Sequence, residues 1–496
     1  MLLSALLHHL GISSVLQHDV IITDITADSR TVQPGSLFVA LKGSQHDGAA
    51  YIPHAIFEGA VAIIRHKKEG TPTILDHYEN GQAIPMIAVE NPARFLALAA
   101  MKLAGSSPDM IAAVTGTNGK SSTVDFVRQI WQKQNVPAAS IGTLGLITDA
   151  DLPPLPPLTT PDSVSLAKAL AGLKKAGIEH VALEASSHGI IQSRLDGLTI
   201  GAAGFSNLTR DHLDYHGTLS AYRDAKLRLF REILTEGGIS VFNADMDTET
   251  VSALRVIAEK RHLKIRDIGR KNGLLTIKSI QPTPTGQIVT IAFSGRTLPP
   301  LSIPLVGSFQ VENALMAAAL CWKDDEDAPE ILSLLSQLEN VPGRCELVAT
   351  LPHNATAYID YAHTPDALEH ILLSLRAHTK GKITLVFGAG GDRDKGKRPL
   401  MGQIAARLAD RIIITDDNPR REDPALIRQE IKNTCPQAQE IPSRHDAIAE
   451  GLHSLQEGDI LLVAGKGHEK GQITGDEVLP FDDRDVTRTL AKEIYA

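Results

Sequence analysis

The stretch MIAAVT-GTNGKS, from Met110 to Ser121, decides the fold of the central part of the chain. Its first six residues are typical of a buried strand, and the glycine-rich turn that follows leads into a helical pattern over Ser122–Gln132. Backbone N–H groups in such a turn, together with the positive end of the helix dipole, favour a bound anion. The sequence therefore predicts a phosphate-binding loop.

The side chains of this loop favour ATP with Mg²⁺. Lys120 would bind the β- and γ-phosphates, and the Ser121 hydroxyl would reach the metal ion. The full Walker pattern has a further glycine where this chain has Val114, so the loop is a shortened form. The alternative is an ordinary glycine-rich turn with a surface lysine. The predicted nucleotide-binding residues of the loop are Gly116, Thr117, Asn118, Gly119, Lys120, Ser121 and Ser122.

Strands alternate with helical patterns on both sides of the loop, which predicts an α/β protein with mostly parallel or mixed sheets. The expected strands are Ser36–Ala40, Ala60–Arg65, Pro85–Val89, His180–Leu183, Ala202–Phe205, Ile239–Asn243, Lys382–Phe387, Arg411–Thr415 and Asp459–Ala464, and the expected helices include Ala93–Ala104, Ser163–Ala176 and Leu219–Leu234. Leu274–Ile303, rich in Thr, Ile and Pro, reads as an antiparallel annex. We expect three domains, residues 1–90, 91–341 and 342–496, the central one of P-loop ATPase type and the last Rossmann-like.

Composition excludes several classes of protein. The 496 residues carry a formal net charge of −9, which does not suit a protein that coats nucleic acid or an anionic membrane. No apolar run approaches the roughly 20 residues that span a bilayer, and we expect no signal peptide. Three widely spaced cysteines form no metal-ligand pattern and fit a reducing cytoplasm. We expect a cytoplasmic monomer.

Two residues of the second segment, Glu184 and His212, are candidates for chemistry. Glu184 follows a strand, where a carboxylate could hold Mg²⁺, although a partly buried glutamate that caps the next helix is the alternative. His212 could ligate a second Mg²⁺ or contact phosphate, although a solvated turn with Asp211 as an N-cap would look the same. Lys226 lies in a helical pattern, and neither spacing nor composition singles it out.

Three strands of the last segment end in charged loops, namely 388–398, 416–420 and 465–469. Ligands of open α/β sheets bind beyond the carboxyl ends of strands, so these loops are expected to converge. They combine arginine and lysine with Asp417 and Glu469, which fits a zwitterion such as an amino acid better than a simple anion. The alternative, three independent solvated turns, explains each loop singly but not all three together.

Seven motifs in this order resemble the Mur ligases, the ATP-dependent enzymes that build the peptide of peptidoglycan, and among them the diaminopimelate-adding members. The motifs are Thr115–Ser121, Glu184–Gly189, Arg210–Gly217, Tyr361–Asp366, Gly390–Arg398, Asp417–Arg420 and Gly465–Glu469. The resemblance covers nearly the whole chain. It implies ATP-dependent addition of meso-2,6-diaminopimelate to UDP-N-acetylmuramoyl-L-alanyl-D-glutamate through an acyl phosphate, with domain closure to exclude water.

The resemblance also implies roles for individual residues. Lys120, Lys226 and His212 would be catalytic, and Ser121, Glu184, His212 and a carbamylated Lys226 would hold Mg²⁺. The further nucleotide contacts would be Asn313, Arg344 and His363. Ser29, Ser44, Gln45 and His46 match the uridine-nucleotide site, and Thr159, Thr160, Ser186, Gln192 and Arg194 match the dipeptide site. Arg393, Asp417, Asn418, Pro419, Arg420, Gly465 and Glu469 match the amino-acid site. Gln310 and Leu158 stand where the family commonly has or allows asparagine.

Three other functions remain open at this stage. A lysine-adding relative and a folylpolyglutamate synthase would differ from the proposed ligase in the amino acid that they accept. A nucleotide-binding regulator without activity would bind ATP but form no product, and the density of acid, histidine and arginine side chains in the loops argues against it.

Overall fold

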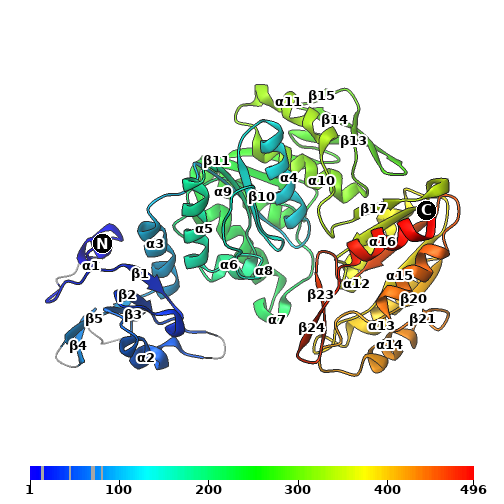
Figure 1. Ribbon diagram of the computed structural model, residues 1–496. Coiled ribbons are helices and arrows are strands. Elements are labelled where there is room, and N and C mark those ends of the chain that lie inside the picture. The colour runs from blue at the N-terminus through cyan, green and yellow to red at the C-terminus, as the bar shows by residue number, and fades with distance from the viewer. Residues whose placement is uncertain (13–15, 44–45, 69–72, 80–81, 496) are drawn as a thin grey trace. The chain divides into compact units, whose positions relative to one another are not determined.

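The computed structural model describes residues 1–12, 16–43, 46–68, 73–79 and 82–495. The chain forms two compact units, Met1–Asp267 and Ile268–Ala496, and each is described by itself. The predicted α/β class is confirmed, because the chain forms three α/β domains whose sheets are mixed or mostly parallel (Figure 1).

The N-terminal sheet has the strand order β1-β2-β3-β5-β4. Its strands are β1 (Asp24–Thr26), β2 (Ser36–Val39), β3 (Ala62–His66), β4 (Ile74–Glu79) and β5 (Gln82–Val89). Among the described strands of this sheet, β4 and β5 pair antiparallel and the other neighbours pair in parallel. Leu37, Val39, Ile64 and Ile87 are buried in one core cluster on this sheet. The three strands expected before residue 90 are therefore present, each with its bounds shifted by a few residues.

The strands around the phosphate loop run in the order β11-β10-β6-β9-β7-β8. They are β6 (Met110–Thr115), β7 (Ala138–Gly142), β8 (Gly145–Ile147), β9 (His180–Glu184), β10 (Ile200–Phe205) and β11 (Leu234–Asn243). All pair in parallel except β7 with β8. The register places Thr115 opposite Phe205, and Val114 opposite Glu184. The carboxyl ends of three strands therefore meet at the loop that begins with Gly116.

The helices of the first unit connect these strands (Figure 1). They are α1 (Leu3–His9), α2 (Ile52–Phe57), α3 (Pro92–Ala104), α4 (Lys120–Lys133), α5 (Ser163–Lys175), α6 (Ser187–Ile191), α7 (Leu213–His216), α8 (Leu219–Arg228) and α9 (Thr248–Lys260). The expected helix Leu219–Leu234 is shorter than predicted. A π-helical turn over Leu229–Ile233 ends it, because Leu234 already pairs with Ile200 as the first residue of β11.

The second unit begins with the antiparallel annex that the sequence predicts. β13 (Leu275–Thr283) and β14 (Gly286–Phe293) form its long antiparallel pair, and β15 (Arg296–Thr297) and β16 (Leu301–Ile303) also pair with β14. The preceding strand, β12 (Lys264–Gly269), crosses the boundary between the units in sequence. Helices α10 (Ser308–Cys321) and α11 (Ala328–Ser333) follow the annex.

The last sheet has the order β17-β18-β22-β19-β20-β21, and only its edge strand β17 is antiparallel. Its strands are β17 (Glu346–Thr350), β18 (Thr356–Asp360), β19 (Ile383–Phe387), β20 (Arg411–Ile414), β21 (Gln439–Glu440) and β22 (Ile460–Ala464). Leu385 and Leu462 face one core cluster, whereas their neighbours Val386 and Val463 face another. Both faces of the sheet are therefore covered, as expected for buried parallel strands.

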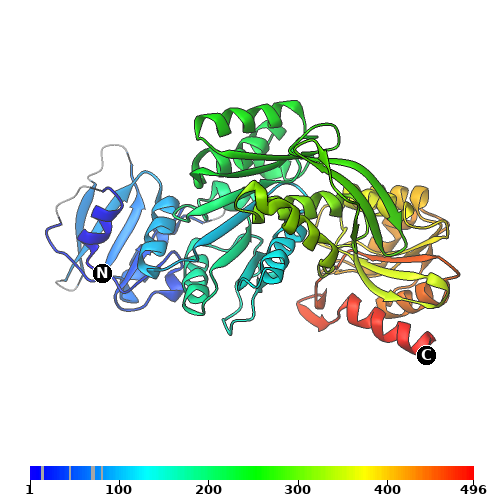
Figure 2. The same cartoon turned by 90° about the horizontal axis from the view of Figure 1, so that it is seen from above.

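Helices from two parts of the second unit supply these two layers (Figure 2). Residues of α12 (Pro365–Arg376), α13 (Lys397–Leu408) and α14 (Pro424–Lys432) belong to the first cluster. Residues of α15 (Arg444–His453) and α16 (Asp483–Tyr495) belong to the second. A hairpin that the sequence did not predict, β23 (Gly471–Thr474) with β24 (Glu477–Pro480), follows the last strand of the sheet.

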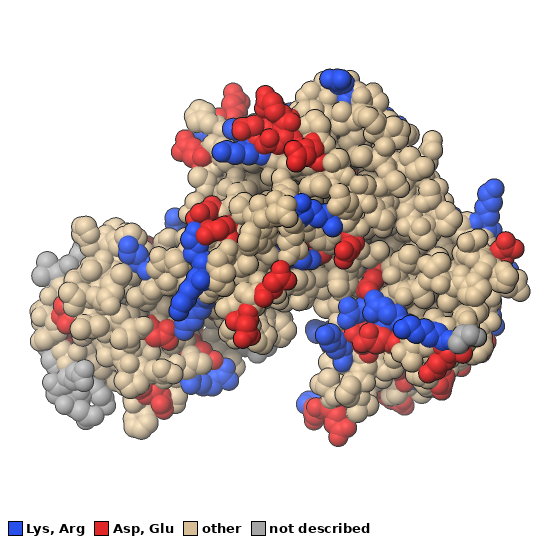
Figure 3. Space-filling view, turned by 45° about the horizontal axis from the view of Figure 1, so that its top comes forward, with Lys and Arg blue, Asp and Glu red and all other residues tan. Residues whose placement is uncertain are grey.

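The surface carries both signs of charge. On the face shown in Figure 3, lysine and arginine side chains lie beside aspartate and glutamate side chains, and no broad field of one sign is visible. Such a mixed face does not attract nucleic acid over a wide area. Across the described ranges, no helix combines the length and the apolar character that crossing a membrane requires.

Candidate active site

The phosphate loop requires glycine at Gly116. This residue has φ +145°, and a Cβ atom there would lie 2.0 Å from Ser206 Oγ and 3.2 Å from the backbone of Asn207. Gly119 has φ +85° and stands at the N-cap of α4. The two glycines thus allow a turn that L-residues rarely adopt, and the turn delivers Lys120 and Ser121 to the start of the helix. The predicted strand, loop and helix are confirmed.

The segment after β10 holds the loop in place. Thr117 N donates to Asn207 O at 2.9 Å, and Asn118 N donates to Asn207 Oδ1 at 2.9 Å. Ser206 Oγ donates to Asn118 O at 2.6 Å. These bonds connect the loop to the adjacent strand end, so the loop has a defined backbone rather than the freedom of an ordinary surface turn.

Two lysine side chains converge on one carbonyl group of the loop. Lys120 Nζ donates to Gly116 O at 3.0 Å and to Thr117 O at 2.8 Å, and Lys226 Nζ donates to Gly116 O at 2.8 Å. Lys226 is only 1% exposed, and its Nζ lies 4.3 Å from the centre of the Tyr222 ring. Burial first, and then the charge of Lys120, hold the pKa of Lys226 well below its usual range. The lysine that no local pattern singled out is therefore a buried amine beside the phosphate loop.

Glu184 is the last residue of β9 and is buried. Its Oε1 accepts from Thr143 N at 2.8 Å, and its Oε2 accepts from Thr143 Oγ1 at 3.3 Å. The alternative role of helix cap is wrong, because Ser186 is the N-cap of α6 and its Oγ accepts from Gly189 N at 3.1 Å. Parallel pairing of β9 with β6 places this carboxylate at the end of the strand beside the phosphate loop.

His212 is exposed in a left-handed conformation, φ +51°, directly before α7. Its Nε2 lies 3.4 Å from Asp211 Oδ2, and its ring centre lies 5.0 Å from that of His188. Asp211 does not cap α7, since the N-cap position belongs to His212 itself. Among the described residues, no three His, Cys, Asp or Glu side chains gather as a metal cage.

The residues predicted to line the dipeptide site form one network with the backbone of Glu184. Thr160 Oγ1 donates to Glu184 O at 2.7 Å, and Arg194 Nη1 donates to Thr160 O at 2.5 Å. Thr143 joins the network through the 3.2 Å contact between its Oγ1 and that of Thr159. The members are Thr159, Thr160, Ser186, Gln192 and Arg194. Leu158, which departs from the family pattern, is exposed beside them.

The predicted uridine-nucleotide residues lie in the N-terminal domain. Ser29 is buried in a short helical turn that Asp28 caps by accepting from Arg30 N at 3.0 Å. Hydrogen bonding from the Arg30 side chain lowers the pKa of Asp28. His46 is exposed, and its backbone oxygen accepts from Gly43 N at 2.9 Å. Ser44 and Gln45 lie outside the described residues.

The predicted nucleotide contacts of the second unit are connected through Gln310. Asn313 Nδ2 donates to Gln310 Oε1 at 2.9 Å, and Gln310 Nε2 donates to Arg344 O at 3.1 Å. The Arg344 guanidinium lies over the Tyr361 ring, 4.6 Å from its centre, and that ring lies 4.6 Å from His363. Gln310 departs from the family pattern, yet its longer amide bridges two of the predicted contacts.

The predicted convergence of the three loops of the last sheet is confirmed. Arg420 Nη1 donates to Gly391 O at 2.8 Å, which joins the loops after β20 and β19. Asn418 Nδ2 donates to Glu469 Oε2 at 2.8 Å, which joins the loops after β20 and β22. A Cβ atom on Gly391 would lie 1.9 Å from Pro419 O, so glycine is required where the first two loops cross. Arg393 is exposed in its loop.

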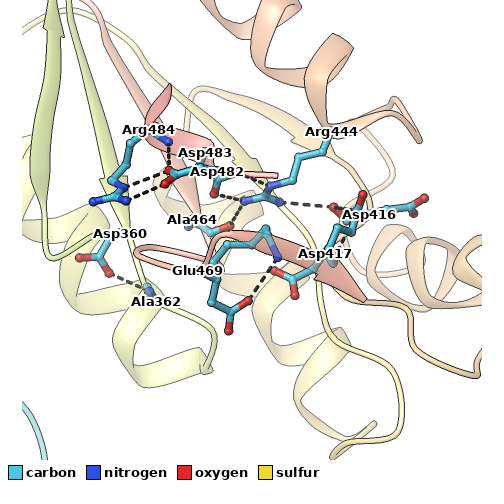
Figure 4. A network of polar contacts seen from close by, with 12 residues as sticks. Asp360, Ala362, Asp416, Asp417, Arg444, Ala464, Glu469, Asp482, Asp483 and Arg484 are labelled. Atoms are coloured by element: carbon cyan, nitrogen blue, oxygen red, sulfur yellow. Dashed lines mark hydrogen bonds and ion pairs between the residues drawn. The ribbon is translucent and has the colours of Figure 1, made fainter. Parts of the chain in front are cut away.

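A buried ion pair lies beside the same loops (Figure 4). The Arg444 side chain is 0% exposed, forms two 2.7 Å contacts with the equally buried Asp483 side chain, and donates to Ala464 O at 3.0 Å. Gly465 follows with φ +120°, and a Cβ atom there would lie 2.5 Å from Asp417 Oδ2. Arg444 therefore fixes the strand end from which Gly465 approaches the Asp417 carboxylate.

Two features of this cluster were missed by the analysis of the sequence. Lys466, inside the motif Gly465–Glu469, is completely buried and donates to both Asn418 and Glu469. The hairpin β23–β24 pairs with the loop after β20, since Arg420 N donates to Ile473 O at 3.0 Å. A lysine between two glycines after a buried strand was a signal that Lys466 belongs to the site. Whether its side chain points inward or outward depends on the tertiary fold.

Comparison with known proteins identifies the class. The model for the Mur ligase middle domain matches residues 114–321, and the model for the Mur ligase glutamate ligase domain matches residues 343–467. The model for the Mur ligase family catalytic domain matches residues 21–102. The chain belongs to the Mur ligase family.

Relatives narrow this class. The chain is 46% identical to the UDP-N-acetylmuramoyl-L-alanyl-D-glutamate–2,6-diaminopimelate ligase of Caulobacter vibrioides over 95% of both chains. It is also 46% identical to the ligase of the same name from Agrobacterium fabrum, over 95% of this chain and 93% of that one. A solved structure of a ligase with this name is 32% identical over 96% of both chains, with a TM-score of 0.70. The folylpolyglutamate synthase of Mycobacterium tuberculosis shares the fold, at 16% identity over 82% of this chain and 95% of that one, with a TM-score of 0.60.

Proposed function

We propose that this protein is the ligase that adds meso-2,6-diaminopimelate to UDP-N-acetylmuramoyl-L-alanyl-D-glutamate in peptidoglycan synthesis. The observation that carries the proposal is that the converged loops contain both a cation and an acid. Arg420 is held on Gly391 O, and Glu469 is held by Asn418. One charge of each sign suits an amino acid, and a phosphate loop in the same chain supplies the means to activate a carboxylate. The names of the relatives point to the same substrates.

The first step joins two anions. The γ-carboxylate of the D-glutamyl residue attacks the γ-phosphate of ATP, its oxygen forms the new P–O bond, and ADP leaves. The result is an acyl phosphate. Lys120 would neutralise phosphate charge, since catalysis of phosphoryl transfer depends mainly on positioning and electrostatics. Thr159, Thr160, Ser186 and Arg194 would hold the dipeptide near the loop, because their network includes the backbone of Glu184.

The residues around the loop fit Mg²⁺ and a carbamylated lysine. Mg²⁺ prefers oxygen ligands, and the Ser121 hydroxyl, the Glu184 carboxylate and a carbamate on Lys226 would provide them, with His212 as a further ligand. A carbamate forms from a neutral amine, and burial of Lys226 favours that form. When bound, Mg²⁺ would screen the repulsion between carboxylate and triphosphate. A native mass spectrum, recorded with bicarbonate present, that shows unmodified Lys226 would contradict the proposed carbamate.

The second step forms the amide. The neutral amine of diaminopimelate attacks the acyl carbon, the C–O bond to phosphate breaks, and phosphate leaves with the bonding electrons. The proton that the amine loses balances the departing group, which is released as hydrogen phosphate. We propose that Arg420 binds the distal carboxylate of diaminopimelate, with Arg393, Asp417 and Glu469 as its neighbours in the site. Lysine lacks that carboxylate and would leave the guanidinium without its partner, which explains how a lysine substrate would be rejected.

The remaining expectations belong to the same proposal. The domains are residues 1–90, 91–341 and 342–496, and Asn313, Arg344 and His363 contact the nucleotide. Ser29 and His46 contact the uridine nucleotide. We propose that the protein acts as a monomer. The cytoplasm, where ATP and nucleotide-linked precursors are available, is the compartment that the three free thiols fit.

The decisive experiment is phosphate release with ATP, the UDP-linked dipeptide and a panel of diaminopimelate, L-lysine and L-glutamate. We expect product only with diaminopimelate. Lys120→Ala should lower turnover at least about 1,000-fold, because the charge on the transferred phosphate loses its main cation. Lys175→Ala, an exposed lysine of α5, is the control. Near-normal turnover of Lys120→Ala, or equal use of L-lysine, would contradict the proposal.

A further inference from the structure

Lys466 is a buried cation that the reaction described above does not use. It follows the last strand of the sheet and is 0% exposed. Its Nζ donates to Asn418 Oδ1 at 3.0 Å, to Glu469 Oε2 at 3.2 Å and to Gly471 O at 2.6 Å. An ammonium group has three N–H donors, and all three are engaged. Lys466 therefore acts on a substrate only through the groups that it holds.

The first of these groups is the Asn418 amide. Its Oδ1 accepts from Lys466 Nζ and also from Ile473 N at 2.9 Å, which engages both lone pairs of the oxygen. The amide can therefore lie only one way, with Nδ2 directed to Glu469 Oε2 at 2.8 Å. Without the cation, Oδ1 would keep the Ile473 N–H donor and Nδ2 would keep the Glu469 acceptor, but the amide oxygen would lose its charged donor.

The second group is the Glu469 carboxylate. Its Oε2 accepts from both Lys466 and Asn418, whereas its Oε1 has no hydrogen-bond partner among the residues that the structure describes. The side chain is 33% exposed. In Figure 4 its carboxylate lies on the side of the cluster away from Arg444. One oxygen is thus anchored on the protein, and the other is presented outward.

We propose that Lys466 is a positioning residue for the amino-acid substrate. It fixes Asn418 and Glu469 so that the outward carboxylate oxygen receives an ammonium group of the incoming amino acid. The inference rests on the proposed function, since it assigns this loop cluster to the amino acid rather than to the nucleotide. It predicts that loss of the Lys466 charge affects amino-acid binding and leaves ATP binding intact.

The test separates KM from kcat in the full-length enzyme. Lys466→Met keeps an unbranched side chain of nearly the same length and removes its charge. It should raise KM for diaminopimelate about ten- to hundredfold, the worth of a charge-assisted hydrogen bond. KM for ATP should stay within about twofold. Lys470→Met, four residues further on and exposed, is the matched control and should leave all constants unchanged. An equal rise in KM for ATP, or a fall in kcat alone, would show a purely structural role.

A double-mutant cycle with Glu469→Gln tests the route. If Lys466 acts through this carboxylate, the double variant should be hardly worse than Glu469→Gln alone, whereas independent roles would multiply the two effects. Lys466→Gln keeps donors without the charge and replaces Lys466→Met if the latter does not fold. Failure of both variants to fold would also overturn the proposal. If the wild-type enzyme prefers another amino acid, the proposed function is wrong. The same double-mutant cycle, measured with that amino acid as substrate, still decides the role of Lys466.

Discussion

At the scale of single residues, Arg420 is fixed by hydrogen bonds of its backbone and of its guanidinium. We expect its side chain to decide which amino acid the enzyme uses. It has φ +52°, an uncommon conformation for a non-glycine residue. Hydrogen bonds from its own N–H to Ile473 and from Gly475 N to its carbonyl oxygen maintain that conformation. The guanidinium is also anchored, through Nη1, on Gly391 O. A fixed guanidinium of this kind suits recognition of a carboxylate.

Arg420→Ala should therefore raise KM for diaminopimelate about a hundredfold and leave KM for ATP within about twofold, because only the distal carboxylate loses its partner. Steady-state kinetics with each substrate varied in turn measures both constants. The side chain of the adjacent Arg421 is 74% exposed and pairs with the exposed Asp476, so Arg421→Ala is the control. A loss of ATP affinity without a loss of amino-acid affinity would place Arg420 in a different site.

Sequence patterns predicted the residues whose role follows from the local backbone conformation. They missed the residues whose role follows from being buried in the tertiary fold. The phosphate loop could be recognised because Gly116 and Lys120 follow a strand and precede a helix. Lys226 could not, since only the fold brings its Nζ to Gly116 O. Lys466 was visible as one letter of a motif, but nothing in the sequence indicated that its amine points inward.

At the scale of elements, His378 connects three parts of the second unit. It follows the C-terminal end of α12, its Nδ1 donates to Thr283 O at 2.8 Å, and its Nε2 accepts from Gly307 N at 3.1 Å. Gly307 is the N-cap of α10, the helix that carries Asn313. These two bonds require the neutral tautomer, and burial lowers the pKa of His378 accordingly. Protonation would place a donor against the Gly307 N–H group.

The sign of the pH effect follows from this lowered pKa. The imidazole of the unfolded chain titrates near 6.5, and that of the folded chain titrates at lower pH. The stability that His378 contributes is therefore fully present above about pH 6.5 and is lost as the pH falls through the folded pKa. His378→Gln can retain an acceptor for Gly307 but cannot titrate. Between pH 7 and pH 5, its melting temperature should fall less than that of the wild type. Parallel losses in both proteins would show that His378 does not contribute.

The elements themselves were largely predictable, because hydrophobic strands and helical periodicity are local properties. The expected strand at 459–464 and the antiparallel annex at 274–303 both appear, with small shifts. The end of α8 was misplaced, because pairing of Leu234 with Ile200 is a tertiary contact that overrides helical propensity. The hairpin β23–β24 was missed, since Gly471–Pro480 has weak alternation and its strands are largely exposed.

At the scale of the whole molecule, each compact unit has core clusters of its own. One cluster of the first unit packs Ile111 with Leu166, and one of the second unit packs Leu385 with Leu462. A chain of this kind need not unfold in one cooperative step. We therefore expect calorimetry to resolve separate transitions, and a substitution in one core should move only one of them.

Arg444→Met tests this expectation. Removing Arg444 leaves the Asp483 carboxylate buried without its cation, which costs about 3–5 kcal/mol. In a unit of this size, the loss lowers the corresponding melting temperature by roughly 10 °C. The other transition should not move, because Arg444 and Asp483 both lie in the second unit. Arg444→Met combined with Asp483→Leu removes both charges and should recover much of the stability, since the burial penalty of the remaining carboxylate disappears. A single transition that shifts as a whole would mean that the two units unfold as one cooperative body.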